Sequence, residues 1–266
     1  MSNPKLPNEE LTKQEVVVAS IEKPAEVIAK PPQSETFDRE AWQPITLLGK
    51  KVKATEIKNI DEILDKGFRI MEPEIVDCLV SNLEIDILSI GQSKGKFGGG
   101  KRSIWRQTQK KTPEGNKPSF STLIVIGNRN GYVGVGLGKA RETVPARGKA
   151  IRTAKLNIIK IRRGCGSWAC RCASPHSIPF QVKGKCGSVE IELIPAPKGT
   201  NLCIEKECKK ILALAGVKDV YARTFGQTRT KLNMMKACFD ALKKLSEMKV
   251  PENYYTKAGI VEGNQI

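Results

Sequence analysis

Phe120-Ser-Thr-Leu-Ile-Val-Ile-Gly127-Asn-Arg-Asn-Gly131-Tyr-Val-Gly134-Val-Gly136-Leu-Gly138-Lys-Ala140 is the stretch of sequence that decides the fold. Its first part contains an apolar run rich in β-branched residues, which is typical of a buried strand. Asn130-Gly131 favours a tight hairpin turn, because both central residues of such a turn need a positive φ. In the second strand glycine occupies every other position, so one face carries no side chains and another backbone can approach it closely.

Basic residues flank this hairpin on both sides. The 266-residue chain has a formal net charge of +17, and most of that charge lies in two windows. Residues 91–117 contain eight Lys or Arg and one acid, and residues 139–163 contain nine and one. Such a field attracts polyanions, so the pattern predicts contact with nucleic acid, and with RNA in preference to a metabolite. The alternative interpretation is an ordinary solvated face.

The composition divides the chain into six segments. Residues 1–36 are rich in Pro, Glu and Lys and are predicted to form a disordered extension. The other expected segments are a helical N-terminal segment (37–81), an RNA-binding domain (82–162), a Cys/His-rich connector (163–177), a second α+β domain (178–250) and a C-terminal tail (251–266). The predicted fold class is therefore α+β.

Capping residues and apolar periodicity predict the helices. Asn59 is expected to begin a short helix, because its side chain can accept hydrogen bonds from first-turn amides. Thr143 to Ile161 is predicted to be one basic helix, with an apolar stripe formed by Ile151, Ala154, Ile158 and Ile161. With a three-stranded sheet, this helix would complete the RNA-binding domain. In the second domain, helices are expected over 204–215, closed by Gly216, and over 229–248.

Three cysteines and the chain's one histidine lie within twelve residues: Cys165, Cys170, Cys172 and His176. Zinc prefers four tetrahedral nitrogen or sulfur ligands, which this segment can supply. The spacing differs from the common pair of cysteines two residues apart, so free thiols beside an ordinary histidine are the alternative. Four protein ligands leave no open position for a substrate, so the expected cofactor is one structural zinc ion.

No enzymatic activity is predicted. Between Glu142 and Glu190 the sequence has no carboxylate that could serve as a local acid or base. Gly95 to Lys101 fits the spacing of a phosphate-binding loop, but Arg102 occupies the position at which Ser or Thr would hold magnesium. No nucleotide cofactor is therefore expected.

The same glycine-rich loop suits RNA phosphates, because its backbone amides and cations can contact a polyanion. An aromatic residue within it can stack on an unpaired base. For Trp105, packing inside the domain is an equal alternative. The candidate RNA-binding residues of this loop and of the basic helix are Lys94, Lys96, Phe97, Lys101, Arg102, Arg147, Arg152 and Lys155.

The sequence shows no secretory signal and no apolar run of 18 residues. We therefore expect a cytoplasmic protein without membrane contact. Its eight cysteines are expected to be thiols or metal ligands and not disulfides. No homo-oligomer is expected.

The hairpin and much of the second half of the chain resemble a known family. Similarity lies in Gly127-Asn, Gly131, Gly134-Val-Gly, Gly138-Lys-Ala-Arg-Glu, Ile194-Pro-Ala-Pro-Lys-Gly199 and Leu214-Ala-Gly-Val-Lys-Asp-Val220. These motifs are similar to those of the universal small-subunit ribosomal protein five family in its archaeal and eukaryotic form. The resemblance covers roughly Leu83 to Leu245. Asn201 departs from the family pattern, which usually has Gly at that position.

The resemblance implies a first domain like the double-stranded-RNA-binding fold, and a structural role in the small ribosomal subunit. It implies contact with rRNA and with small-subunit proteins four and eight, near the mRNA entry, where mRNA itself is a further candidate partner. Stabilisation of the head and body arrangement and support of translational accuracy follow from that position. Residue by residue, the loop from Lys94 to Arg106 is expected to face rRNA, with Lys139 and Arg141 nearby. A free RNA chaperone or assembly factor is the alternative.

Overall fold

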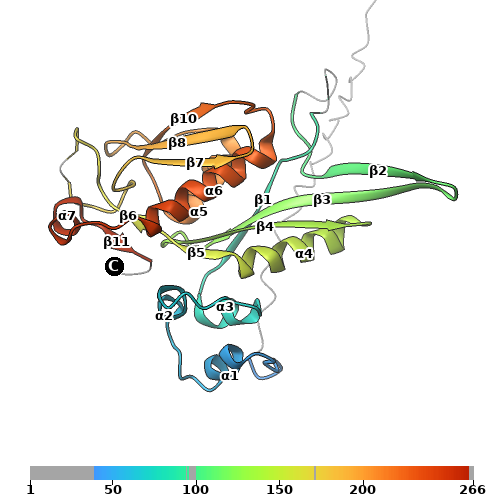
Figure 1. Cartoon of the computed structure of the whole chain (residues 1–266), viewed down its shortest axis with the longest axis horizontal. Coiled ribbons are helices and arrows are strands. Elements are labelled where there is room, and N and C mark those ends of the chain that lie inside the picture. Colours follow the sequence, from blue (N-terminus) through green and yellow to red (C-terminus); the bar gives the residue numbers. More distant parts are fainter. Residues whose placement is uncertain (1–38, 94, 96–99, 171, 264–266) are drawn as a thin grey trace, which may run out of the picture. The chain divides into compact units, whose positions relative to one another are not determined.

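The structure is a computed structural model that describes residues 39–93, 95, 100–170 and 172–263. The predicted extension at 1–36 lies outside the described residues, as do Lys94, Lys96 and Phe97. Where the chain is described, it is a mixture of helices and mainly antiparallel sheets, with one parallel pair between β9 and β10, which confirms the predicted α+β class (Figure 1).

Three short helices form the N-terminal segment: α1 (Leu47–Lys53), α2 (Ile60–Asp65) and α3 (Glu74–Leu79). Their apolar side chains share one core with Tyr132 and Ile158 of the domain that follows. Asn59 is at the N-cap of α2, but its side chain makes no capping hydrogen bond, so the predicted cap is wrong. The first turn instead carries Asp61 and Glu62, whose negative charge complements the helix N-terminus.

In the described part of the chain, the first domain has a five-stranded sheet where three strands were expected. Its strands are β1 (Glu84–Leu88), β2 (Arg106–Thr112), β3 (Gly115–Gly127), β4 (Tyr132–Ala140) and β5 (Ile158–Lys160). The order is β1-β3-β4-β5, and β2 pairs with the outer part of β3. The predicted hairpin between β3 and β4 is confirmed, but its turn differs from the predicted one: positive φ occurs at Arg129 (58°) and Gly131 (101°), and not at Asn130.

The predicted helix at 143–161 is too long. The observed α4 (Thr143–Leu156) ends at Asn157, and Ile158 belongs to β5, which pairs with Tyr132–Gly134. Consecutive β-branched residues after an Asn favour a strand when the edge of β4 is available for pairing. This conversion from the end of a helix to a strand supplies one of the extra strands of the sheet.

α4 packs on β4 at backbone distance. A Cβ atom at Gly134, Gly136 or Gly138 would lie 2.2, 2.2 and 2.0 Å from the carbonyl oxygens of Ala154, Ala150 and Ala146 respectively. The glycine stripe therefore admits the backbone of a helix whose contact face is itself made of alanine. This confirms the prediction that another backbone approaches the glycine face.

The second domain contains a further sheet of order β7-β8-β10-β9 among the described residues. Its elements are β7 (Val182–Cys186), β8 (Val189–Pro195), β9 (Leu202–Cys203), α5 (Lys206–Ala215), β10 (Val220–Phe225) and α6 (Lys231–Glu247). Around it lie β6 (Arg162–Arg163), α7 (Glu252–Ala258) and β11 (Val261–Glu262), and β11 pairs with β6. Gly216 ends α5 in the left-handed conformation, as predicted.

One apolar core continues from the first sheet into the second domain. Leu123, Val125, Val133 and Val135 belong to the same buried cluster as residues of α5 and α6. α5 contacts β1, β3 and β4 (Figure 1). The inner half of the first sheet therefore has α4 on one face and α5 on the other. Among the described helices, none combines the length and the apolar character needed to cross a membrane.

Candidate nucleic-acid interface and metal centre

A row of cations crosses β2, β3 and β4. Arg106 pairs with Ser121 in register, and Ser121 pairs with Lys139 on its other side. Lys110 pairs with Lys117 four residues further along the β2–β3 hairpin. Directly opposed residues, and residues two apart on one strand, have side chains on the same face of a sheet. We call this set the cationic face: Arg106, Lys110, Lys117 and Lys139.

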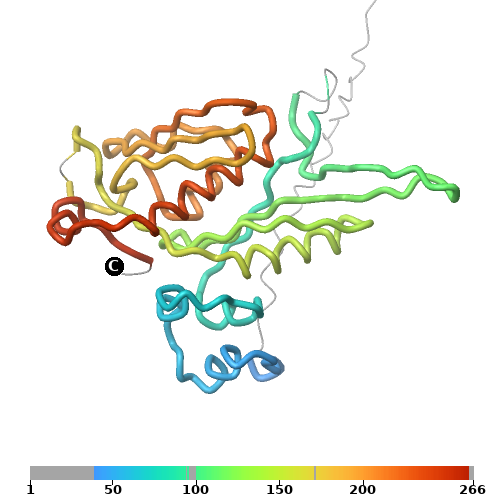
Figure 2. Tube along the Cα trace, in the orientation of Figure 1, coloured from blue at the N-terminus to red at the C-terminus, as the bar shows by residue number. Residues whose placement is uncertain are grey.

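The cationic face lies opposite α4. Gly138 points toward α4, so its neighbour Lys139 points to the other side. On that other side, Leu123 and Val125 of β3 are buried under the second domain, whereas the outer parts of β2 and β3 are exposed. Figures 1 and 2 show the β2–β3 hairpin extending past the end of β4, beyond α4 and α5. The described residues thus leave the outer half of this face uncovered.

The charges on the cationic face are almost uncompensated. Among the described residues, the one ion pair that this face makes joins Lys117 Nζ to Glu114 Oε2 at 2.8 Å, and both side chains are more than half exposed. An exposed pair of this kind contributes little. Lys110 stands directly opposite Lys117, and like charges at opposed positions of a sheet are destabilising. A polyanion bound across the hairpin would remove that repulsion.

The predicted loop from Gly91 to Arg102 lies between β1 and β2. At its ends the Gly91 amide donates to the Ser103 carbonyl, the Ser103 amide donates to the Gln92 carbonyl, and a bridge joins Ser93 to Arg102. The Arg102 guanidinium also donates to the Gly91 carbonyl at 3.4 Å, so this side chain closes the base of the loop. Lys101 is exposed. The loop therefore presents Lys101 outward beside the start of β2.

The predicted cations of α4 lie on the other side of the sheet. Arg147 and Arg152 belong to α4, and Arg141 precedes it. Lys155 donates to Asp77 Oδ2 at 2.6 Å, and this pair, about four-fifths buried, ties α4 to α3. The structure therefore brings Arg106 and Lys139 together but not the α4 cations, and Lys155 has an internal partner.

Sequence reasoning did not single out Lys110 and Lys117. They become neighbours only through the register of the β2–β3 hairpin, which is set by the two-residue turn at 113–114. The turn dipeptide Pro113-Glu114 followed by Gly115 was the available signal, because it lies between two segments rich in polar and basic residues.

The four predicted metal ligands come together. One ligand atom from each of Cys165, Cys170, Cys172 and His176 lies within 4.8 Å of the others. His176 Nε2 is 3.8 Å from Cys170 Sγ. These separations fit a tetrahedral site, in which metal–ligand bonds measure about 2.0–2.3 Å. The cluster can therefore hold a metal ion.

The cysteines differ in their environments. Burial raises the pKa of Cys165 to about 11. A hydrogen bond with Ser174, whose Oγ lies 3.0 Å from the sulfur, lowers the pKa of the exposed Cys172 to about 6. The backbone amide of Cys165 donates to the Ala258 carbonyl at 2.7 Å, which fixes the start of the loop against α7. Cys172 thus provides a thiolate at neutral pH beside a buried thiol.

Asp219 orients the histidine of the cluster. His176 Nδ1 lies 2.8 Å from Asp219 Oδ2, and both side chains are buried. This contact favours the tautomer with the proton on Nδ1, which leaves the lone pair of Nε2 directed at the cysteines. A carboxylate behind a histidine ligand is a common arrangement at metal sites. Because Asp219 lies 43 residues beyond His176, its role was not predictable from local spacing.

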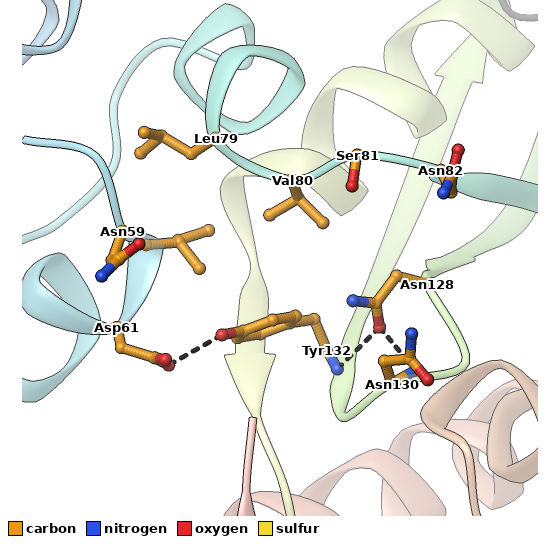
Figure 3. A pocket seen from close by; sticks show the side chains of 10 residues that line it. Asn59, Asp61, Leu79, Val80, Ser81, Asn82, Asn128, Asn130 and Tyr132 are labelled. Atoms are coloured by element: carbon orange, nitrogen blue, oxygen red, sulfur yellow. Dashed lines mark hydrogen bonds between the residues drawn. The ribbon is translucent and has the colours of Figure 1, made fainter. Parts of the chain in front are cut away.

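A second polar feature lies where α2 and the β3–β4 turn meet. Figure 3 shows this pocket of about 360 Å³, in which the Tyr132 hydroxyl donates to Asp61 and Asn128 Oδ1 accepts from the amides of Asn130 and Tyr132. None of the residues that line it is basic. Its hydrogen bonds fix the hairpin turn and join it to α2, so we assign the pocket a structural role.

Comparison with known proteins identifies relatives over most of the chain. A family described as ribosomal protein S5, N-terminal domain, matches residues 104–162, and one described as ribosomal protein S5, C-terminal domain, matches residues 184–253. Small ribosomal subunit protein uS5 of Nanoarchaeum equitans is 52% identical over 85% of this chain and 97% of its own length. The uS5 proteins of Methanocaldococcus jannaschii and Methanococcus maripaludis are 47% and 46% identical, over 85% and 87% of this chain and 98% and 96% of their own lengths.

Proposed function

Because this chain belongs to the ribosomal protein S5 family, it is a structural, non-enzymatic protein of the small ribosomal subunit, and we propose that it binds folded rRNA through the cationic face. The observation that carries this proposal is the direct opposition of Lys110 and Lys117 on an exposed hairpin. Such an arrangement is unfavourable in isolation and favourable against phosphates. Phosphate contacts position a protein on RNA without reading its bases.

The proposed interface extends to the neighbouring loop. Lys101 lies beside the cationic face at the start of β2, and the residues from Lys94 to Phe97 belong to the same loop in the sequence. We include Arg102 and Arg141 as flanking cations. Arg147 and Arg152 would contact a separate RNA segment, because α4 covers the opposite face of the sheet. Lys155 is left out because Asp77 is its partner.

The working assembly follows from these assignments. The RNA-binding domain (82–162) and the C-terminal domain (178–250) share an apolar core and act together on the ribosome in the cytoplasm, joined by the Cys/His connector (163–177). Its neighbours are rRNA and small-subunit proteins four and eight near the mRNA entry, where mRNA is a further candidate. A rigid clamp at this place would stabilise the head and body arrangement and support translational accuracy.

The test is incorporation into subunits. Lys110→Gln with Lys117→Gln should reduce the amount of protein retained on small subunits in high-salt sedimentation. The control is Lys50→Gln with Lys51→Gln, which removes the same charge from exposed positions of α1. Equal retention of both double variants would refute the assignment of the cationic face. One copy per mature particle supports a structural constituent, whereas enrichment on immature particles favours an assembly factor.

A second proposal concerns the metal centre. We propose that Cys165, Cys170, Cys172 and His176 bind one structural zinc ion. The observation in its favour is the buried Asp219 behind His176, which presents Nε2 to three sulfur atoms. Bound zinc would cross-link the connector, and four protein ligands leave no position for substrate. The set of soft sulfur and imidazole ligands suits zinc better than magnesium or calcium.

Zinc content of the purified protein tests this proposal. We expect one zinc per chain by elemental analysis, loss of the metal in Cys165→Ser, and retention in Cys203→Ser, which changes an exposed cysteine outside the cluster. Asp219→Asn should weaken zinc binding about 10–100-fold, the usual effect of removing such a partner. A metal-free protein whose unfolding temperature is insensitive to chelator would contradict the proposal.

A further inference from the structure

A basic pocket of about 670 Å³ lies between the β3–β4 turn and the second domain. Its lining includes Arg129 of the turn, Arg163 of β6, Lys209 of α5 and Lys218 after α5, with apolar surface from Leu202 and Ala213. We call it the Arg163 pocket. It is separate from the cationic face, which lies on the outer parts of β2, β3 and β4.

Among the described residues, the buried Arg163 has no acidic partner. Arg163 is only 8% exposed, and its Nη2 donates to the Gly263 carbonyl at 3.0 Å. Its Nε is buried and has no hydrogen-bond partner in the part of the chain that the structure describes. Burial lowers the pKa of Arg163, and the interaction that opposes this shift comes from Tyr132 and not from a described carboxylate. Its neighbour Arg162 shows the usual arrangement, with Nε 2.6 Å from Glu262 Oε1.

An unpaired buried guanidinium is costly, because burial removes its hydration and no opposite charge replaces it. The side chain is nevertheless held in place. Gly216 has a φ of 85°, and a Cβ there would lie 2.9 Å from Arg163 Nη1 and 2.1 Å from the Arg129 carbonyl oxygen. The backbone at Gly216 therefore leaves just enough room for the guanidinium at this wall of the pocket.

The rim of the pocket adds free positive charge. Lys209 and Lys218 are exposed, and neither forms an ion pair with a residue that the structure describes. Arg129 contributes less, because Glu84 accepts from its Nη2 at 2.7 Å. An anion in the pocket would meet one buried guanidinium and two ammonium groups, with no lining carboxylate to repel it.

We propose that the Arg163 pocket binds the phosphate of one unpaired rRNA nucleotide, an inference that rests on the rRNA-binding function proposed above. The planar guanidinium suits phosphate oxygens, and the apolar surface from Leu202 and Ala213 can take the sugar or base. A pocket of about 670 Å³ has room for a single nucleotide but not for an RNA helix. The protein would then contact RNA on two separate surfaces.

Site-specific crosslinking in assembled subunits tests this proposal. A photoreactive amino acid in place of Ala213, an exposed α5 residue in the pocket lining, should crosslink to rRNA. Arg163→Met in the same chain should remove most of that crosslink. The same amino acid in place of Thr108, between Arg106 and Lys110 on β2, reports on the cationic face independently.

The two sites separate the possible outcomes. An rRNA crosslink at both positions, with only the Ala213 one sensitive to Arg163→Met, supports the pocket. Two results overturn the proposal for the pocket and leave the proposed function intact. In the first, position 213 crosslinks to protein. In the second, position 213 gives no crosslink while position 108 crosslinks to rRNA. Absence of rRNA crosslinks at both positions overturns both. If Arg163→Met does not assemble, Lys209→Gln with Lys218→Gln replaces it, and an undiminished crosslink overturns the proposal.

Discussion

The two faces of the first sheet are built from the same strands but are covered in different ways. On one face, glycines of β4 meet alanines of α4 at backbone distance, and the contact is sealed within the protein. On the other, the inner half is covered by α5, and the outer half carries four cations and little compensating charge. Alternate residues of one strand thus lie on two different surfaces, one packed against a helix and one exposed and positively charged.

The comparison shows that side-chain size and charge determine which partner can pack against each face of a sheet. Where the side chains are absent, a helix of the same chain can lie close enough to exclude every other partner. Where lysines oppose each other, none of the described segments compensates their charge, and an external polyanion is the fitting partner. The sealed face should therefore determine stability, and the cationic face should determine RNA affinity with little effect on stability.

The largest expected effect is on the sealed face. Gly136→Ala places a Cβ 2.2 Å from both the Ala150 carbonyl oxygen and the Ala154 amide nitrogen. Backbone atoms cannot move aside as side chains do, so we expect a loss of about 1–3 kcal/mol or more in the free energy of unfolding. Urea denaturation measures it.

Gly148→Ala is the matched control for that substitution. It lies in α4, and a Cβ there has no neighbour within 4 Å. Alanine is the better helix former, so this change should stabilise the protein by about 0.5–1 kcal/mol. Equal loss of stability in the two variants would show that the sealed contact is not what Gly136 provides.

On the cationic face, one substitution should change stability and RNA binding in opposite directions. Lys110→Glu replaces a repulsive cross-strand pair with an attractive one, so the free protein should gain about 0.2–1 kcal/mol. The same change should weaken rRNA binding. Thermal unfolding and filter binding at fixed salt measure the two effects.

Lys111→Glu is the control for position. It makes the same charge change one residue along β2, where the side chain points to the other face and the cross-strand partner is Asn116. A similar loss of RNA binding in both variants would mean that net charge, and not the cationic face, determines affinity.

Sequence patterns predicted the sealed face well and the cationic face only in part. Alternating glycines and the Asn130-Gly131 pair are local signals, so the two strands, the hairpin and the close helix contact followed from them, although the conformation of the turn did not. The helix end at Leu156 did not, because β5 exists only when the edge of β4 is present to pair with Ile158. Non-local pairing also hid the Lys110–Lys117 pair, which depends on register.

The metal centre was likewise predictable from the sequence only in part. Its four candidate ligands lie within twelve residues and were visible in the sequence, and the structure brings them together. Asp219 was not visible, because β7, β8, β9 and α5 separate it from His176 along the chain. That Arg163 has no acidic partner among the described residues is likewise a property of packing, since the adjacent Arg162 has one from β11.

A smaller effect concerns the number of phosphates contacted. Lys117→Gln should reduce the slope of log affinity against log salt by about 0.7–0.9, the value for one phosphate contact. Binding to rRNA measured between low and moderate salt gives this slope. An unchanged slope would place Lys117 outside the interface, whatever the change in affinity at one salt concentration.

The last prediction contrasts a lysine of the sealed side with those of the cationic face. Lys155→Gln leaves the salt slope unchanged but removes the partner of Asp77, at a cost of about 0.5–1 kcal/mol at neutral pH. Burial already raises the pKa of Asp77, with Lys155 opposing the rise, so the variant should raise it further. A carboxyl whose pKa is higher in the folded than in the unfolded state stabilises the fold as pH falls. The stability gap between variant and parent should therefore narrow from pH 7 toward pH 4, and a gap independent of pH would mean that Lys155 acts through packing and not through Asp77.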